Sequence, residues 1–154
     1  MLERRAARST DAPSIVLWFP TRADAISWGG PDVPEPLTST WLAQQIETGR
    51  YWVWVNQGGT IEGVFSLRFL KEGSARLGRF ALSPSLRGQR LAKGLIEEIK
   101  TLARSLGAKQ LSLGVYGSNQ IARHIYDSIG FQVFGERIAE EDSSGVSYQM
   151  RLNL

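Results

Sequence analysis

The sequence predicts an α/β domain in which a single mixed, mostly antiparallel sheet is flanked by helices on both faces. Strand-like and helical segments alternate along the chain in the order β-α-α-β-β-β-α-β-α-β-β. The segment 91–106 places its apolar residues on one helical face. The segment 51–55 (YWVWV) is apolar on both faces, which is typical of a strand that is covered on both sides. Together these three observations predict one mixed sheet that helices cover on both faces.

The N-terminal third of the chain predicts one strand and two helices. Residues 1–13 are polar and rich in arginine, and we expect them to form a flexible arm, with residues 14–154 as a single domain. The apolar run 14–19 (SIVLWF) predicts the first strand, which Pro20 ends. A helix over 22–28 follows, with Thr21 as its N-cap, and a second helix runs from about Ser39, its expected N-cap, to Thr48.

The rest of the chain predicts a hairpin region and then two helix–strand units. Three antiparallel strands are expected over 51–56, 60–70 and 74–83, because glycine-containing turns separate them. A helix over 91–106 and a strand over 109–116 follow. Ser118 or Asn119 caps a second helix that runs to Ile129 and ends at Gly130. Strands over 131–139 and 146–154, joined by a turn at 143–145, complete the sheet.

Composition excludes several classes of chemistry. The 154 residues contain no cysteine and one histidine, so thiolate metal sites, a cysteine nucleophile and a Ser-His-Asp hydrolase are not expected. No apolar stretch approaches the roughly 20 residues of a membrane span, and residues 1–12 lack the apolar part of a signal peptide. We therefore expect a cytoplasmic protein that uses no metal and has no membrane partner.

Positive charge is concentrated in the middle of the sequence. Ten basic and three acidic residues lie between Arg68 and Lys109, although the whole chain carries a net charge of only +3. A protein that coats nucleic acid usually spreads its positive charge more widely, and no helix-turn-helix pattern is present. The distribution therefore favours a local anion site over a nucleic-acid partner, with a solvated helix face as the alternative.

The junction between the strand ending near Leu82 and the helix beginning near Leu91 is the strongest local signal. Arg87, Gly88 and Arg90 occupy the loop, and Lys93 follows it. A helix N-terminus with free backbone N–H groups binds phosphates readily, and basic side chains strengthen such a site. The loop contains neither the P-loop pattern nor the dinucleotide-binding glycine pattern, so it predicts a phosphate-binding turn of another kind.

This loop resembles the acyl-CoA loop of the GNAT superfamily of N-acetyltransferases, whose pattern is [Q/R]-x-x-G-x-[G/A]. Residues 87–92 (RGQRLA) match it at Arg87 and Ala92, and Leu82-Ser83-Pro84 is similar to the strand end that precedes it. Arg90 stands where the family usually has its central glycine. A side chain at that position either crowds a pyrophosphate or adds a cation to it.

A second segment carries the same resemblance independently. Residues 119–131 are similar to the family signature N-x-x-A-x-x-x-Y-x-x-x-G-F and match it at Asn119, Ala122, Tyr126, Gly130 and Phe131. Residues seven apart on a helix differ by only about 20° in direction, so Asn119 and Tyr126 lie on one side, about 10 Å apart. A purely structural reading remains open, in which Asn119 is an N-cap and Tyr126 a core residue.

The resemblance implies an acetyl-CoA-dependent N-acetyltransferase, in which a primary amine attacks the thioester directly. It implies that a backbone N–H near Leu82 contacts the thioester carbonyl, in the gap where that strand splays from the strand over 109–116. It also implies that Tyr126 protonates the departing thiolate and that Asn119 contacts the pantetheine or phosphate end of the cofactor. The pyrophosphate would be held by the loop residues Arg87, Gly88, Gln89, Arg90, Leu91 and Ala92.

The base that accepts the proton of the amine is open in the sequence. No Asp or Glu occurs between Gly73 and Ile96, so we place a water chain first. Glu62, facing solvent at a strand edge, and Glu72, in an exposed turn, are weaker candidates, as are Asp32 and Glu35. We expect His124 to be a surface residue.

The acceptor is expected to be a small molecule or to resemble an amino acid. Three arginines, Arg68, Arg76 and Arg79, lie on strands that helices should cover, and one that points inward needs an anion. A carboxylate on the acceptor amine is one candidate for that anion. A catalytically weak acyl-CoA-binding module is the alternative function, and a homodimer is left open.

Overall fold

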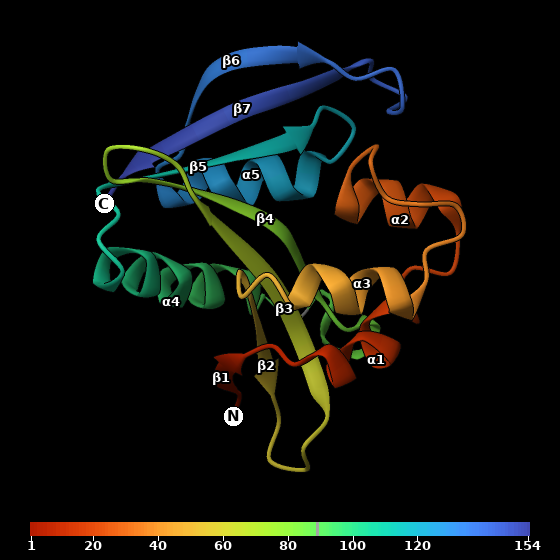
Figure 1. Cartoon of the computed structure of the whole chain (residues 1–154). Helices are drawn as coiled ribbons and strands as arrows, with labels where there is room; N and C mark the ends of the chain where they lie inside the picture. The colour runs from red at the N-terminus through yellow and green to blue at the C-terminus, as the bar shows by residue number, and fades with distance from the viewer. Residues whose placement is uncertain (89) are drawn as a thin grey trace. The chain divides into compact units, whose positions relative to one another are not determined.

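The computed structural model describes residues 1–88 and 90–154, and within them seven strands form one mixed sheet in the order β1-β2-β3-β4-β5-β7-β6 (Figure 1). The fold class predicted from the sequence, a sheet with flanking helices, is confirmed. The strands are β1 (Glu3–Ala6), β2 (Tyr51–Val55), β3 (Ile61–Phe69), β4 (Ser74–Leu82), β5 (Gln110–Tyr116), β6 (Gln132–Ile138) and β7 (Val146–Asn153). The α-helices are α1 (Ala12–Val16), α2 (Arg22–Gly29), α3 (Ser39–Ile46), α4 (Ala92–Ser105) and α5 (Gln120–Ile129).

The chain divides into two compact units. The first contains residues 1–66 and the described residues from 79 to 88. The second contains residues 67–78 and 90–154. The assignment of residues 14–154 to a single domain stays a prediction.

The first unit begins with a strand where the sequence predicts a flexible arm. β1 pairs antiparallel with β2, with Glu3 opposite Val55 and Ala6 opposite Trp52. A pattern of alternating hydrophobicity does not predict this strand, because three of its four side chains are charged. Its pairing depends on backbone hydrogen bonds. Arg5 also anchors the segment, since its guanidinium donates two hydrogen bonds of 2.8 and 2.9 Å to the carboxylate of the buried Asp11.

The strand predicted over residues 14–19 is wrong, because these residues form most of helix α1 and its exit. Pro13 lies in the first turn of α1, where its missing N–H costs nothing. Ile15, Trp18 and Phe19 are buried at a spacing of three and four residues, which is the helical period. A six-residue apolar run does not distinguish a strand from a short buried helix, and tertiary packing selects the helix here.

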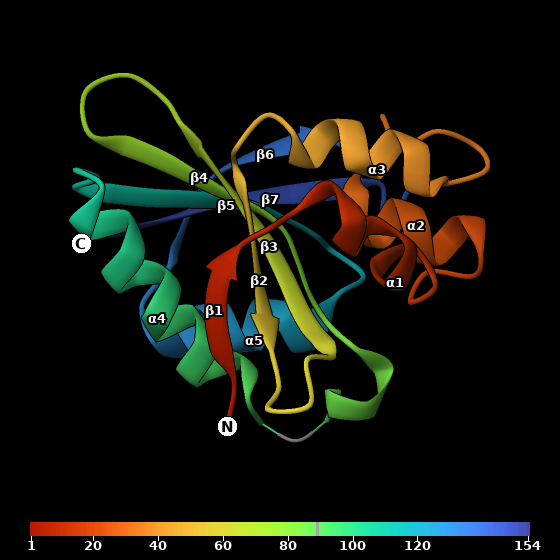
Figure 2. The same cartoon turned by 60° about the horizontal axis from the view of Figure 1, so that its bottom comes forward.

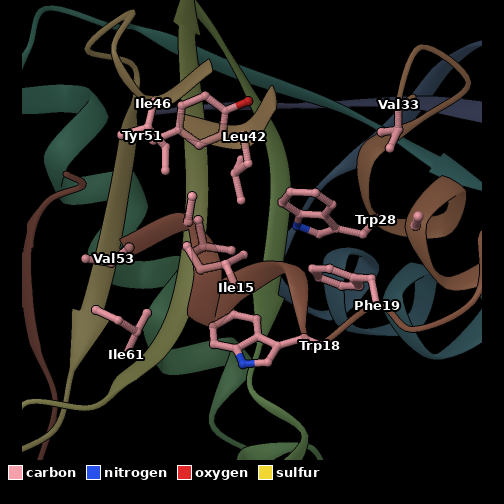
Figure 3. Packing of buried hydrophobic residues seen from close by; sticks show 13 residues of the cluster. Ile15, Trp18, Phe19, Trp28, Val33, Leu42, Ile46, Tyr51, Val53 and Ile61 are labelled. Atoms are coloured by element: carbon pink, nitrogen blue, oxygen red, sulfur yellow. The ribbon is translucent and has the colours of Figure 1, made fainter. Parts of the chain in front are cut away.

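The helices of the first unit share one hydrophobic core with β2 and β3. Figure 2 shows α1, α2 and α3 gathered together, and Figure 3 shows the side chains between them. Phe19 stacks on Trp28 with a centroid separation of 4.4 Å. The predicted N-cap Thr21 is confirmed by its bond from the Asp24 N–H, whereas α3 is capped by Thr38 and not by Ser39.

The second unit contains the strands β5, β7 and β6, which lie side by side (Figure 1). β7 pairs antiparallel with both neighbours, and β4 pairs parallel with β5 from Ser74–Gln110 to Arg76–Ser112. The apolar residues Leu111, Leu113 and Val115 of β5 are buried. The alternate positions of these strands carry polar side chains, which line the opposite face of the sheet.

Candidate active site

The residues that the sequence predicts for the cofactor divide between the two units. Leu82, Arg87 and Gly88 belong to the first unit. Arg90, Leu91, Ala92, Asn119 and Tyr126 belong to the second. The predicted cofactor residue Gln89 lies outside the described residues.

In the first unit, the loop after β4 is tied to the strand end by Arg87. The Nε of Arg87 donates a hydrogen bond of 3.1 Å to the carbonyl of Leu82, and its Nη2 lies 3.5 Å from the carbonyl of Trp18. Gly88 has a left-handed φ of 77°, and a Cβ built there would meet no atom within 4 Å. The loop is therefore open beside Gly88, and only its backbone conformation requires glycine.

In the second unit, Arg90 adopts a backbone conformation that favours glycine. Its φ is 59°, in the left-handed region that a non-glycine residue occupies at a cost. Its side chain is exposed. Leu91 precedes helix α4 without a side-chain cap, so the first turn of this 14-residue helix is not closed by a capping side chain.

Asn119 and Tyr126 lie on helix α5. The Asn119 Oδ1 accepts a hydrogen bond of 3.2 Å from the Ala122 N–H, so its side chain caps the helix, and Gly130 ends the helix with a φ of 116°. Tyr126 is half-buried, and its ring meets Phe131 edge-on at 5.6 Å. Burial raises the pKa of the Tyr126 phenol to about 12. The phenol is therefore fully protonated at neutral pH.

The carboxylates considered as bases occupy different environments. Glu62 is buried rather than solvent-facing, because β3 is covered on both faces from Ile61 to Phe65. The Ser83 Oγ donates a hydrogen bond of 3.3 Å to Glu62. Glu72 is exposed in a turn, as expected, and His124, Asp32 and Glu35 are also exposed.

The three strand arginines also differ in their surroundings. Arg68 is exposed. Arg79, in the first unit, donates hydrogen bonds to the Gly29 carbonyl at 3.2 Å and to the Tyr51 hydroxyl at 2.6 Å, and it lies over the Trp41 ring. Its guanidinium is therefore held by neutral groups of the fold.

Arg76, in the second unit, is half-buried and donates a hydrogen bond of 2.8 Å to the Oε1 of Gln149. Sequence reasoning missed Gln149, which is 4% exposed, and the neighbouring Gly114. In the sequence, Gln149 is only a polar residue between Tyr148 and Met150 in a predicted strand. Its position opposite Gly114 follows from the strand register, which the sequence does not show.

The described part of the chain contains neither a candidate metal cluster nor a helix that could span a membrane. Among these residues, no group of three or more His, Asp or Glu side chains is placed to hold a metal ion. No helix found within the same ranges has the length and apolar character needed to cross a membrane.

Comparisons with known proteins place the chain in a family. Residues 18–131 match the model of the acetyltransferase (GNAT) family. The uncharacterized N-acetyltransferase YycN of Bacillus subtilis (strain 168) is 42% identical over 53 residues, a match that covers 34% of each chain.

Solved structures share the fold at low identity. The spermidine N-acetyltransferase of Vibrio cholerae, solved in complex with CoA and spermine, has a TM-score of 0.81 and 20% identity, over 99% of this chain and 95% of that one. A phosphinothricin acetyltransferase of Sinorhizobium meliloti, solved in complex with AcCoA, has a TM-score of 0.77 and 21% identity, over 99% and 88%. With the family model matching most of its length, the chain belongs to the GNAT family of acetyltransferases.

Proposed function

We propose that the protein transfers an acetyl group from acetyl-CoA to the primary amine of a small or amino-acid-like acceptor. The observation that carries this proposal is Tyr126, a phenol at the tyrosine position of the family signature whose ring packs edge-on against Phe131 and whose pKa burial raises. A general acid must hold its proton until the leaving group develops charge. Tyr126 meets that requirement across the physiological pH range.

The transfer itself needs no covalent enzyme intermediate. The neutral amine nitrogen attacks the thioester carbonyl carbon, and a backbone N–H near Leu82 stabilises the oxyanion that forms. The C–S bond then breaks, its electron pair leaves on sulfur, and the Tyr126 hydroxyl gives its proton to that sulfur. Water takes the proton that the amine loses and returns a proton to Tyr126.

The raised pKa of Tyr126 does not forbid this proton transfer. A thiol has a pKa of about 8.5 in water, so its thiolate is a weaker base than the phenolate of a tyrosine with a pKa of about 12. Proton transfer from that phenol to a thiolate in water would therefore be unfavourable. The same desolvation that raises the pKa of the phenol, however, raises the pKa of a thiol placed beside it. The two groups are therefore better matched at the site than their separate values suggest.

The loop and helix start fit a pyrophosphate. In the first unit, Gly88 leaves open space and Arg87 brings positive charge. In the second unit, Arg90 is charged and α4 begins without a side-chain cap. Arg90 has a left-handed backbone conformation, and its exposed side chain would add positive charge to a bound phosphate. We assign the phosphate contacts to Arg87, Gly88, Gln89, Arg90, Leu91 and Ala92, and a contact with the pantetheine or phosphate end of the cofactor to Asn119.

The test combines calorimetric binding of acetyl-CoA with turnover on a panel of amines. We expect one micromolar site that Arg87→Ala weakens, and turnover that Tyr126→Phe lowers without changing acetyl-CoA affinity. Tyr148→Phe is the matched control, because Arg123 packs on the Tyr148 ring and, among the described residues, the Tyr148 hydroxyl has no hydrogen bond. Binding without turnover of any amine would support a CoA-binding module instead, and no binding would overturn both functions.

A further inference from the structure

Arg76 lies at the point where the parallel pairing of β4 and β5 ends. Its register partner is Ser112, and Ser112 is in turn opposite Arg151 on β7. Residues 112, 114, 147, 149 and 151 share one face of the sheet, because successive side chains of a strand point to opposite faces. The face that Arg76 shares with Gln149 is therefore polar at its centre.

Gln149 connects Arg76 to a second polar group. Its Oε1 accepts from the Arg76 Nη2 at 2.8 Å, and its Nε2 donates to the Ser147 Oγ at 3.2 Å. The buried amide is thus fixed in one orientation by a partner at each end. The Ser147 hydroxyl, which is half-buried, keeps its own hydrogen for a further acceptor.

The absence of a side chain at Gly114 lets these polar groups pack closely against the β5 backbone. A Cβ built on Gly114 would lie 2.8 Å from the Arg76 Nη2, 3.1 Å from the Gln149 Nε2 and 3.4 Å from the Ser147 Oγ. Gly114 is nevertheless exposed, so this polar cluster is reached from solvent. Three polar atoms that can donate hydrogen bonds therefore lie together beside the exposed Gly114.

The charge at this position is positive and unbalanced. Among the described residues, no carboxylate is hydrogen-bonded to or paired with Arg76, whose partner is the neutral Gln149. Burial lowers the pKa of Arg76, and the nearby Arg137 and Arg68 lower it further. A half-buried guanidinium flanked by two more cations favours an anionic ligand.

We propose that Arg76, Gln149 and Ser147 bind the carboxylate of the acceptor, which makes the acceptor a small amine that carries a carboxylate. This inference rests on the proposed acetyl transfer. A planar guanidinium and an adjacent amide match the two oxygens of a carboxylate, and the cluster's positive charge repels polyamines. Arg76 is thus a specificity-determining residue rather than a catalytic one.

The experiment compares acceptors that differ only in the carboxylate. An amino acid, its amide and the corresponding decarboxylated amine are assayed with acetyl-CoA, and spermidine is included as a polycation. We expect kcat/KM to be about 10- to 150-fold higher for the amino acid than for its amide, which is the range for hydrogen bonds to a charged group. The preference should reside mainly in KM, since the carboxylate is bound equally in the ground and transition states.

Two variants remove the site by different means. Arg76→Gln deletes the charge, and Gly114→Ala places a methyl group between the donors; each should abolish the preference for the carboxylate. Arg104→Gln removes an exposed arginine from α4, and Gly135→Ala adds a methyl group where no atom lies within 4 Å. These controls should keep the preference, and acetyl-CoA affinity should be unchanged in all four, which also shows that each variant is folded.

The outcomes separate the two proposals. Equal turnover of the amino acid, its amide and spermidine by the unaltered protein overturns the carboxylate site while acetyl transfer stands. Retention of the preference in both Arg76→Gln and Gly114→Ala also overturns it. If no amine is acetylated, the proposed function fails, and calorimetric binding of the amino acid but not its amide still supports the carboxylate site.

Discussion

The indole Nε1 of Trp28 donates a hydrogen bond of 2.9 Å to the backbone carbonyl of Arg79. Arg79 has a φ of 48° in the interior of β4, a conformation that strands of ordinary residues do not adopt. Its side chain is held at the same time by Tyr51 and Gly29. A strained residue persists when surrounding contacts determine its position, and here α2 and β2 supply them.

Loss of the Trp28 bond should therefore destabilise the fold beyond the loss of volume. Trp28→Phe keeps an aromatic ring to stack on Phe19 but leaves the Arg79 carbonyl without this donor. Trp18→Phe is the matched control, because Trp18 is similarly buried and its indole N–H makes no hydrogen bond that the structure records. We expect Trp28→Phe to lower the free energy of unfolding by about 1 kcal/mol more than Trp18→Phe, measured by urea denaturation. Equal losses would contradict a role for the bond.

The left-handed backbone of Arg90 predicts an unusual ranking of two substitutions. Arg90→Gly and Arg90→Ala both remove the charge and the side-chain contacts. At a φ of 59°, glycine is unstrained while alanine is not, so the glycine variant should be about 1 kcal/mol more stable. At an ordinary backbone position the ranking is the reverse, because glycine gains more freedom in the unfolded chain. Urea denaturation of the two variants decides between these cases.

The Arg90 pair also tests the role of the side chain in cofactor binding. If the guanidinium contributes charge to the pyrophosphate, both variants should weaken acetyl-CoA binding, and the loss should shrink as salt is raised. Tighter binding by Arg90→Gly would instead mean that the arginine crowds the loop.

The middle and C-terminal elements could be predicted because their signals are local. The apolar positions of α4 recur at helical spacing, and Gly130 ends α5 in the left-handed conformation expected of a C-cap. Asn119 and Tyr126 could be placed on one helix for the same reason. The strands from β2 to β7 were bounded by turns whose glycines and polar residues are visible in the sequence.

The structural features that the sequence did not predict depend on contacts between distant parts of the chain. β1 depends on backbone bonds to β2, and α1 on packing of Ile15 and Trp18, neither of which a local pattern reports. The burial of Glu62 depends on the coverage of both faces of β3, and the Arg76–Gln149 pair joins residues 73 positions apart. Polar partners brought together across strands leave no periodic signal in the sequence.

The Arg5–Asp11 pair should make the stability of the first unit sensitive to acid. Burial alone would raise the pKa of Asp11, but hydrogen bonds from the Arg5 guanidinium and the Arg8 N–H, together with both positive charges, lower it. A carboxyl group with a lowered pKa stabilises the fold above its unfolded pKa of about 3.9, and that stability is lost as the pH falls through the lower folded value. Asp11→Asn should thus cost about 1–3 kcal/mol at pH 7.

The comparison is made by urea denaturation between pH 7 and pH 2. The gap between Asp11→Asn and the unaltered protein should narrow below about pH 4, because protonation removes the same charge. Asp24→Asn, at an exposed position of α2, is the control and should change stability little at any pH. A gap that stays constant down to pH 2 would show that the charge of Asp11 does not stabilise the fold.

Tyr126 gives the sharpest prediction for activity. Because burial raises its pKa to about 12, the phenol keeps its proton while the acceptor amine, of pKa about 10, becomes neutral. The value of kcat/KM should therefore rise with pH and show no fall up to pH 10.5, whereas a tyrosine of ordinary pKa would begin to lose its proton there. Tyr126→Phe should lower kcat by about 100-fold or more, which is the usual contribution of a general acid, and Tyr148→Phe should not.

The raised pKa of Tyr126 also links the stability of the fold to pH. The stability contributed by the protonated phenol is complete below pH 10 and is lost as the pH approaches 12, so alkaline denaturation should be weaker in Tyr126→Phe. A fall in kcat/KM centred near pH 10 in the unaltered protein, absent from Tyr126→Phe, would show instead that Tyr126 is solvated at the working site and ionises as an exposed phenol does.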